Sequence, residues 1–417
     1  MKFAHNIKIM KKIKVILSTF GPLHLIKSAE YLCPFVDIKV IQGWIPAWWN
    51  KWLLKPISSI IGYDLSRTIK KRTPACLEDR NVGIGLPEFF CNVVHYITRN
   101  PKRQTAWIVK SYHMYGKQSR KYIQNADVFH VRSGSGRGGA IESAKRAGMK
   151  ILVDHSIAHP VYMEQILKDE YKRNDTYFDM GISNSFWREI VDDCDAADIL
   201  LVNSSFVRDT FIATGYNPEK IRIAYLGVRK DFFSLKNNYE LEGSIKILFT
   251  GGFGFRKGAE YALMAMQELE KRNIDYIFTV VGNYSGAQKL IEKYPIKNLN
   301  LIGFVPQDFL KKYLAENDIY LFPSLSEGCA SSGMEALAAG LPVIATAESG
   351  FPISDGKTGF IVKAKNVDEI VNRIMQLWES KELRENMGKA AATMIREQYT
   401  WEKYAESVVN IYNEMLG

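Results

Sequence analysis

The stretch Glu327-Gly328-Cys329-Ala330-Ser331-Ser332-Gly333-Met334-Glu335 places two carboxylates eight positions apart. An apolar run over 319–322 predicts a buried strand before it, and residues 334–339 predict a helix after it. A strand, a glycine-containing loop and a helix start form a corner that can face a ligand. The N–H groups of residues 331–333 would lie near the helix N-terminus, where unpaired donors and the helix dipole favour an anion such as a diphosphate.

The two glutamates supply the second half of that chemistry. With Glu335 in the first turn of the helix and Glu327 at the end of the strand, both carboxylates could face one pocket. Carboxylates are good acceptors for the hydroxyl groups of a sugar or a ribose. The alternative is an exposed loop with two surface glutamates, because an isolated pair at this spacing is common by chance.

Length and composition set the wider frame. A chain of 417 residues exceeds the roughly 250–300 residues at which one core stops growing, so two domains are expected. With 47% apolar and 24% charged residues the composition is that of a soluble globular protein. The five cysteines are scattered and have no metal-binding spacing, which favours a reducing compartment and no zinc site. The apolar run near the amino terminus is too short for a signal peptide or a membrane span, and predicts a first core strand.

Net charge is concentrated at the amino-terminal end. Residues 1–72 carry thirteen Lys or Arg and three Asp or Glu, so they hold all of the chain's formal charge of +10. Such a basic end points to an anionic partner such as acidic lipid or a lipid-linked diphosphate. A nucleic-acid partner is not expected, because no binding motif accompanies the basic residues.

A tryptophan-rich stretch at 43–56 lies within this basic end. Tryptophans beside lysines at an apolar boundary suit a bilayer interface, and an internal helix that completes the core is the alternative. The candidate acceptor-binding or membrane-binding residues are Trp44, Trp48, Trp49, Trp52, Lys51 and Lys55.

Strands and helices alternate along both halves, which predicts an α/β protein with two Rossmann-like domains and a cleft between them. The predicted organisation is a first Rossmann-like domain at 1–228, a polar linker at 229–243 and a second Rossmann-like domain at 244–398. Residues 399–417 form a terminal helix, because apolar side chains recur there at three- and four-residue steps.

Three further segments in the first half carry candidate chemistry. The glycine-rich loop 132–139 follows a predicted strand and is either the floor of a ligand site or a mobile connector. His155 and His159 follow the next predicted strand and are candidates for substrate contacts, with structural roles as the alternative. Asp193-Cys194-Asp195 matches a metal-binding D-x-D only formally, and its acidic helical setting favours a solvated face.

In the second half, the loop 251–258 follows a predicted strand. Its glycines permit close approach of a phosphate to the backbone, and Arg256 and Lys257 can neutralise that phosphate. The alternative is a glycine-rich turn with two solvated bases.

The string from Pro323-Ser324 through Glu327 and Glu335 to residues 336–345 resembles the signature of the family 4 retaining glycosyltransferases. The resemblance covers the whole second half and is looser in the first half, at 204–233. It implies the GT-B fold, with an acceptor-binding domain at 1–228, a nucleotide-sugar-binding domain at 244–398 and a carboxyl-terminal helix that crosses back to the first domain. It also implies transfer of a sugar from a nucleotide donor with retained configuration. Neither a metal nor a cofactor is implied beyond the nucleotide-sugar itself.

Residue by residue, the resemblance implies that Lys257 binds the diphosphate, Glu327 the hydroxyls of the donor sugar, and Glu335 the ribose. His155 resembles the family histidine close to the reacting carbon, and His159 is its rival. The family often has Arg where this chain has Gly252, and Arg256 is the candidate substitute. The full donor-binding set is Gly252, Arg256, Lys257, Val305, Glu327, Gly328, Cys329, Ala330, Ser331, Ser332 and Glu335.

These inferences predict a cytoplasmic glycosyltransferase, peripheral on the inner face of the cell membrane. It would extend a saccharide or lipid-linked acceptor in polysaccharide or lipopolysaccharide synthesis. Two alternatives stay open: a nucleotide-sugar 2-epimerase of the same fold, and a catalytically silent GT-B subunit that binds a partner transferase.

Overall fold

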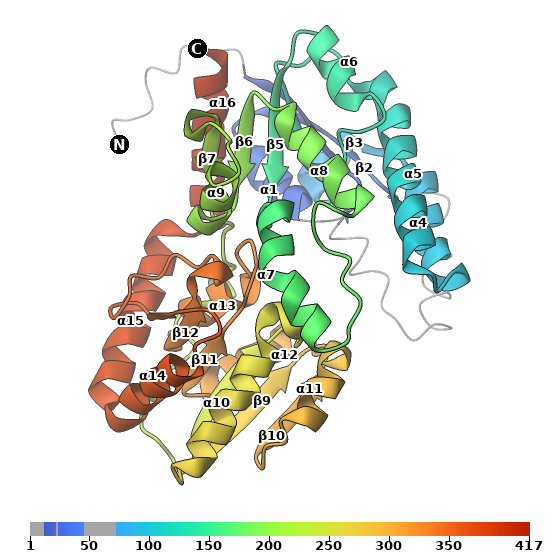
Figure 1. Cartoon of the computed structure of the whole chain (residues 1–417). Coiled ribbons are helices and arrows are strands. Elements are labelled where there is room, and N and C mark those ends of the chain that lie inside the picture. The colour runs from blue at the N-terminus through green and yellow to red at the C-terminus, as the bar shows by residue number, and fades with distance from the viewer. Residues whose placement is uncertain (1–11, 22–23, 46–71) are drawn as a thin grey trace, which may run out of the picture. The chain divides into compact units, whose positions relative to one another are not determined.

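The computed structural model describes residues 12–21, 24–45 and 72–417 (Figure 1). The chain divides into two compact units. The first holds the described residues up to His155 together with Ile182–Leu201 and Ala405–Gly417, and the second holds Ser156–Gly181 and Val202–Tyr404.

The first sheet has seven strands in the order β3-β2-β1-β4-β5-β6-β7. The pairs from β3 to β5 are parallel, and their strands are rich in buried Val, Ile and Leu, as expected for a sheet covered by helices. Because β1 lies beside both β2 and β4, the strand order reverses there, and the carboxyl ends of these strands form the edge where such sheets bind ligands. The strands are β1 (Lys14–Thr19), β2 (Asp37–Gln42), β3 (Asn81–Gly83), β4 (Val128–Arg132), β5 (Lys150–His155), β6 (Ile199–Val202) and β7 (Ile221–Ile223).

Helices alternate with these strands along the chain. They are α1 (His24–Leu32), α4 (Gly85–Ile97), α5 (Pro101–Ser119), α6 (Ala140–Arg146), α8 (Ser185–Asp195) and α9 (Ser205–Ile212).

The second sheet has six strands, all paired in parallel, in the order β10-β9-β8-β11-β12-β13. Its strands are β8 (Ile245–Thr250), β9 (Tyr276–Val281), β10 (Leu299–Gly303), β11 (Ile319–Phe322), β12 (Val343–Thr346) and β13 (Phe360–Val362). The helices of this unit include α7 (Pro160–Arg173), α10 (Ala259–Lys271), α11 (Gln288–Lys293), α12 (Gln307–Glu316), α13 (Ser331–Ala339), α14 (Val367–Glu379) and α15 (Lys381–Gln398). Two Rossmann-like sheets in one chain confirm the predicted fold class.

The terminal helix α16 (Trp401–Leu416) passes into the first unit from Ala405 onward. Its predicted apolar stripe is buried, with Val408 and Tyr412 fully so. The Tyr412 hydroxyl lies 2.7 Å from Nδ1 of His130, a buried residue of β4. These contacts confirm that the carboxyl-terminal helix packs on the first Rossmann-like domain.

Two helix boundaries differ from the sequence prediction. The sequence of residues 119–125 can be interpreted as a further helix, but in the structure the long helix α5 ends at Ser119 and a single 3-10 turn follows it. The start signal at Asn100 explains the difference, because its side chain accepts a hydrogen bond from the Arg103 amide and Pro101 occupies the first helical position. Helix α13 begins at Ser331, so Glu335 lies in the second turn and not in the first.

The segment predicted as a linker belongs to the second unit and is held by hydrogen bonds within it. The amides of Ser234 and Lys236 donate to the carbonyls of Ala338 and Ala339, at 2.8 and 2.9 Å. The Tyr239 hydroxyl donates to the carbonyl of Gly340 at 2.8 Å. Residues 234–239 are therefore fixed against the end of α13.

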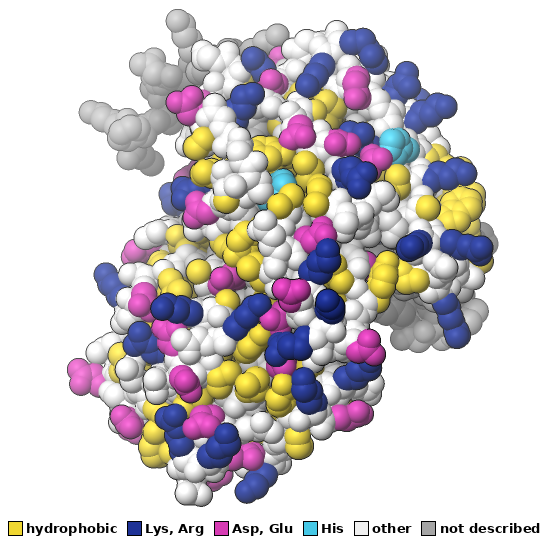
Figure 2. Space-filling view, viewed as in Figure 1, with side chains coloured by type: hydrophobic (Ala, Val, Ile, Leu, Met, Phe, Trp, Pro, Cys, Tyr) yellow, Lys and Arg dark blue, Asp and Glu magenta, His cyan; other side chains and the backbone are white. Residues whose placement is uncertain are grey.

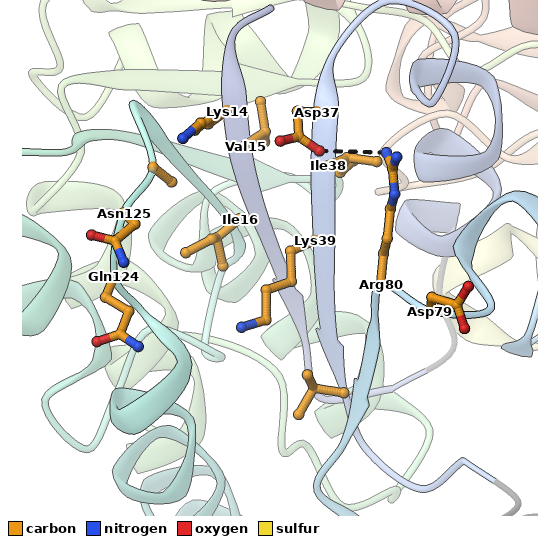
Figure 3. Close-up of a pocket in the computed structure, with 12 residues that line it drawn as sticks. Lys14, Val15, Ile16, Asp37, Ile38, Lys39, Asp79, Arg80, Gln124 and Asn125 are labelled. Carbon is orange, nitrogen blue, oxygen red and sulfur yellow. Dashed lines mark ion pairs between the residues drawn. The ribbon is translucent and has the colours of Figure 1, made fainter.

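A cavity of 290 Å³ lies beside the first residues of β1 and β2 (Figure 3). Its lining includes Lys14, Lys39 and Arg80, and Arg80 pairs with Asp37 at 3.4 Å. Of the residues predicted to bind donor or acceptor, none that the structure describes lines it. Among the described residues, no helix has the length and apolar character that crossing a membrane requires.

Candidate functional site

The loop after β8 presents two cations to the end of β11. Gly258 has a φ of +73°, and a Cβ atom there would lie 1.9 Å from the Pro323 carbonyl oxygen. Only glycine permits this approach, so the loop 251–258 is fixed against the segment that leads to Glu327. The carbonyl of Arg256 accepts a hydrogen bond from the Leu325 amide at 2.8 Å, which strengthens the same contact.

Arg256 and Lys257 converge on one carboxylate oxygen. The Arg256 Nη1 and Lys257 Nζ atoms lie 2.6 and 3.2 Å from Oε1 of Glu327. Arg256 also donates to the Ser326 carbonyl at 2.7 Å, and the Lys257 ammonium lies over the ring of Phe322 at 5.0 Å. Two cations beside a single carboxylate leave an excess positive charge that suits a polyanionic ligand.

Helix α13 starts directly after this ion pair. Its first backbone N–H groups belong to Ser331 and Ser332, and Ala330 before them has no side chain able to cap the helix. The Ser332 hydroxyl contacts the Thr250 carbonyl at 3.2 Å and the Tyr320 hydroxyl at 3.0 Å, which holds the helix start against β8 and β11. An anion at this end would meet backbone donors and a favourable helix dipole.

Gly328 and Cys329 are tightly packed between Glu327 and α13. A Cβ atom at Gly328 would lie 2.0 Å from the Ser156 carbonyl oxygen, so the loop passes too close for any larger residue. Cys329 is buried, and burial raises the pKa of its thiol above the ordinary range. Cys329 is therefore a packed neutral thiol and not a nucleophile.

Glu335 projects from α13 toward α12. Its Oε1 accepts a hydrogen bond from Nε2 of Gln307 at 2.7 Å, and Gln307 in turn accepts one from Arg229 at 2.7 Å. Burial raises the pKa of Glu335 to about 7, although Gln307 and Arg229 act in the opposite direction. The carboxyl group thus titrates near neutral pH.

Two donor-site candidates are less enclosed. Gly252 lies on the exposed part of the loop, and a Cβ atom built there meets nothing within 4 Å. The position could therefore hold the Arg that the family often has. Val305 is half-buried and follows β10 in a short connection before α12.

His155 is the last residue of β5, in the first unit, and it is buried. Its Nδ1 atom lies 2.9 Å from the hydroxyl of Ser133, the residue that follows β4. This hydrogen bond orients the imidazole and leaves Nδ1 committed to the serine.

The preceding residue, Asp154, gathers three basic side chains. It lies 3.1 Å from His24 Nε2, 2.8 Å from Arg132 Nη1 and 3.9 Å from His130 Nε2. Burial alone would raise the pKa of this carboxyl group, but His24, His130 and Arg132 hold it well below its usual range. Asp154 is thus a buried anion beside His155 at the carboxyl edge of the sheet.

Asp193 is not on a solvated face, which corrects the sequence prediction. Its side chain is buried, and Oδ2 accepts hydrogen bonds from the amides of Gly134 and Gly136 at 2.7 and 2.8 Å. Arg137 lies 3.7 Å from its other oxygen. The acidic helix α8 therefore turns one carboxylate inward to hold the glycine-rich loop.

Serines and glycines of the glycine-rich loop make different contacts. The Ser133 hydroxyl contacts His155, and the Ser135 hydroxyl accepts a hydrogen bond from the Phe20 amide at 3.0 Å. The glycine amides between and after them bind Asp193. An internal carboxylate thus occupies the donors that a ligand phosphate would need, and the loop is a fixed support for the end of β5.

His159 lies in the second unit and caps α7. Its Nδ1 atom accepts from the Val161 amide at 3.3 Å, and its ring packs edge-on against Phe211 with the centroids 4.8 Å apart. The two candidate histidines therefore have different settings: His155 ends a strand, whereas His159 is a buried helix cap.

The tryptophan-rich prediction falls mainly outside the described residues. Of its members, only Trp44 is described, and its amide donates to Glu88 at 2.5 Å while Arg72 lies over its ring at 5.8 Å. Trp48, Trp49, Trp52, Lys51 and Lys55 lie in the segment that is not described. Among the described residues, no group of three or more His, Cys, Asp or Glu side chains could hold a metal ion.

Comparison with known proteins places this site in context. Residues 231–394 match the family model of glycosyl transferases group 1. An amylovoran biosynthesis glycosyltransferase, AmsK of Erwinia amylovora, is 32% identical over 165 residues, which cover 37% of this chain and 40% of that protein. In eight curated relatives the matched segment covers 40% to 62% of their length, so the chain spans about half of each.

Solved structures resemble almost the whole chain. Sucrose-phosphate synthase from Thermosynechococcus elongatus superimposes with a TM-score of 0.68 at 16% identity, covering 97% of this chain and 99% of that one. Anabaena Alr3699/HepE in complex with UDP and glucose gives a TM-score of 0.60 at 14% identity, covering 96% and 100%. At these identities the likeness establishes the GT-B fold alone. The family model adds that residues 231–394 are similar in sequence to glycosyl transferases group 1.

Proposed function

We propose that this chain is a retaining glycosyltransferase that moves a sugar from a nucleotide-sugar donor to a saccharide or lipid-linked acceptor in surface glycan synthesis. One observation carries the proposal. Arg256 and Lys257 converge on Glu327 at the point where helix α13 begins. All of these residues lie within the segment that matches the glycosyl transferase group 1 model.

The proposed donor site assigns a part of the nucleotide-sugar to each group. Lys257, Arg256 and the first amides of α13 bind the diphosphate, and Glu335 accepts hydrogen bonds from the ribose hydroxyls. Glu327 binds the hydroxyls of the donor sugar. The HepE structure holds UDP, and the relative AmsK is named for amylovoran biosynthesis, which makes UDP-sugars and polysaccharide acceptors the first candidates.

The chemistry needs stabilisation of the charge that develops on the departing nucleoside diphosphate. Fixed cations and helix amides supply it without rearranging during the reaction. We propose that Arg256 and Lys257 do so without a metal or a further cofactor. Same-face attack by the acceptor hydroxyl, with the leaving phosphate taking its proton, would retain the anomeric configuration.

The proposal also covers a residue of the first unit and the cellular location. His155 is the candidate for a contact near the reacting carbon, because Ser133 fixes its orientation at the carboxyl edge of a parallel sheet. We further propose that the protein works in the cytoplasm at the inner face of the cell membrane, where lipid-linked acceptors are found.

A donor screen tests the proposal. Thermal unfolding is measured with a panel of nucleotide-sugars, and the stabilising donor is then incubated with and without saccharide and lipid-linked acceptors. We expect one donor to raise Tm, because a ligand that binds only the folded state stabilises it. Product formation should require the acceptor, and nuclear magnetic resonance should show the donor's anomeric configuration in the product.

Matched variants locate the site. Lys257→Ala and Glu335→Ala should lose the Tm shift, whereas Lys271→Ala, which removes an exposed lysine paired with Glu268 on α10, should keep it. A full shift in Lys257→Ala would refute the donor-site assignment. If the donor were isomerised when no acceptor is present, the protein would be an epimerase and not a transferase.

A further inference from the structure

Exposed apolar side chains are concentrated on two helices of the first unit. Among the described residues, eleven large hydrophobic side chains are exposed, and five of them lie between residues 86 and 107. They are Leu86 (55%), Phe89 (62%), Phe90 (38%), Ile97 (77%) and Trp107 (42%). A patch of this kind does nothing for the stability of an isolated chain and usually marks an interaction surface.

The spacing along α4 places four of these side chains on one stripe. Residues 86, 89, 90 and 97 follow steps of three, four and seven, which return to the same side of a helix. The opposite side is the one that anchors α4. There Glu88 is buried and forms an ion pair with Arg72 at 2.5 Å. The apolar side chains of the outward stripe therefore do not contribute to the core.

Helix α5, which packs against α4, adds positive charge. From Phe89 to Ala126 the chain has no Asp or Glu and seven Lys or Arg: Arg99, Lys102, Arg103, Lys110, Lys117, Arg120 and Lys121. Arg103, Trp107 and Lys110 share one face of α5, with the Lys110 ammonium 4.7 Å from the centre of the Trp107 ring. Figure 2 shows dark blue and yellow side chains together on the side where Figure 1 has α4 and α5.

We propose that this α4–α5 surface, defined by Leu86, Phe89, Phe90, Ile97 and Trp107 with the basic residues of α5, binds the interface of an anionic lipid bilayer. The apolar stripe would enter the boundary between headgroups and acyl chains, and the cations would meet acidic headgroups. An aromatic side chain beside a lysine is suited to that boundary.

Charge also decides against a second copy of the chain as the occupant. Two such surfaces face to face would bring like charges together without a single carboxylate between residues 89 and 126 to offset them. An anionic bilayer is complementary to the same charges. The inference rests on the membrane association within the proposed function and assigns it to a surface. Because vesicle binding needs no donor, its failure is distinguishable from failure of sugar transfer.

Vesicle sedimentation of the full chain tests the surface. Vesicles of phosphatidylcholine alone are compared with vesicles containing one part in three of phosphatidylglycerol, at low and high salt. We expect binding to the anionic vesicles that weakens with salt. Phe89→Ser with Phe90→Ser, and separately Lys102→Glu with Arg103→Glu, should each lower the partition coefficient by about tenfold or more, since each removes two interfacial contacts.

Two matched controls lie in the second unit. Phe304→Ser removes the most exposed of the large hydrophobic side chains, and Lys312→Glu reverses an exposed lysine. Both should bind vesicles as the unchanged chain does. All substituted side chains are solvent-exposed, and thermal unfolding of each variant confirms that it is folded.

Several results would overturn the proposal. Equal binding to neutral and anionic vesicles would show that charge does not drive the binding. Unchanged binding of both α4–α5 surface variants would show that this surface does not contact the bilayer. Loss of binding only on replacing Trp48, Trp49 and Trp52 with Ser would move the contact to that segment. Dissociation of an oligomer by the α4–α5 surface variants, without any vesicle binding, would make a second copy the occupant.

Discussion

Protonation of Glu335 should affect donor binding at the proposed site. Its side chain is half-buried beside α12, and this burial raises its pKa to about 7. The amide of Gln307 stabilises the ionised form but does not cancel the loss of solvent. Protonation replaces an acceptor oxygen by a donor hydroxyl, so the two forms present different groups to a ribose.

Donor affinity should therefore depend on pH. Glu335 is ionised above about pH 7 and protonated below it, so nucleotide binding should weaken as the pH falls, by up to about tenfold between pH 8 and pH 6. Calorimetric Kd values of the nucleotide at several pH values measure this directly, without contributions from catalysis. In Glu335→Gln the affinity should be lower and flat over that pH range. A variant that kept the pH dependence would show that another group causes it.

Gly252 offers a test of phosphate recognition in the opposite direction. A side chain at this position meets open space, so Gly252→Arg should fold normally and add a third cation to the loop. We expect nucleoside diphosphate to bind about fivefold more tightly, which corresponds to about 1 kcal/mol. Equilibrium dialysis gives the affinity, and an unchanged Kd would mean that Arg256 already fills this role.

The neighbouring Gly258 supplies the matched contrast. Its positive φ and the 1.9 Å approach to the Pro323 carbonyl leave no room for a side chain. Gly258→Ala should therefore destabilise the second unit, by roughly 1–3 kcal/mol from backbone strain alone. Chemical unfolding compares the two variants. Equal stability would contradict the view that only one of these glycines is structurally required.

Sequence reasoning recovers some site residues and misses others for a physical reason. Lys257 and Glu327 lie in the loops that follow β8 and β11, so a strand-loop-helix pattern locates them. Gln307, Ser133 and Asp193 act through side chains from distant helices and loops, and no local pattern signals those contacts. The only hint for Asp193 was an acid on a helix next to a cysteine that is itself buried.

At the scale of elements, α8 and the glycine-rich loop form one unit of structure. The Asp193 carboxylate binds the Gly134 and Gly136 amides, and that arrangement places the Ser133 hydroxyl against His155. Arg137 reaches back from the loop to Glu189 on α8 at 2.6 Å. A loop that looks flexible from its glycines is thus held at both ends by the acids of one helix.

Asp193 should make stability depend on pH in a definite direction. Burial raises the pKa of Asp193 to about 7, despite the two glycine amides and Arg137. The folded chain then retains a proton that the unfolded chain loses above about pH 4. Its contribution to the free energy of unfolding is therefore full at low pH and declines as the pH rises toward 7.

Asp193→Asn isolates that contribution. The amide keeps an oxygen for the two glycine N–H groups but does not ionise, so the variant should gain relative to the unchanged chain as the pH rises from 5 to 8. The gain should be on the order of 1–4 kcal/mol. Urea unfolding at several pH values measures it, with Asp195→Asn, an exposed neighbour on α8, as the control. A difference independent of pH would mean that Asp193 does not titrate in this range.

For the whole molecule, two doubly wound sheets were predictable because most of the described strands are short apolar runs and most are followed by a helix. The terminal helix was predictable from its apolar stripe, and its return to the first domain from the family resemblance. Its contact with His130 was not predictable from the sequence. The length of α5 was not, since its exposed face is basic and its apolar residues are few. The apolar periodicity that predicts a helix is weak in α5, because few of its side chains pack into the core.

The donor site should also be visible in hydrogen exchange of the complete chain. All proposed donor residues lie between Gly252 and Glu335, within the second unit. Because bound nucleotide must be released before its contacts open, UDP alone should slow exchange in the peptides 250–258 and 327–335. Lys257→Ala should remove this protection, whereas Lys271→Ala should leave it intact. Protection that survived in Lys257→Ala would place the diphosphate elsewhere, even if the chain transferred sugar.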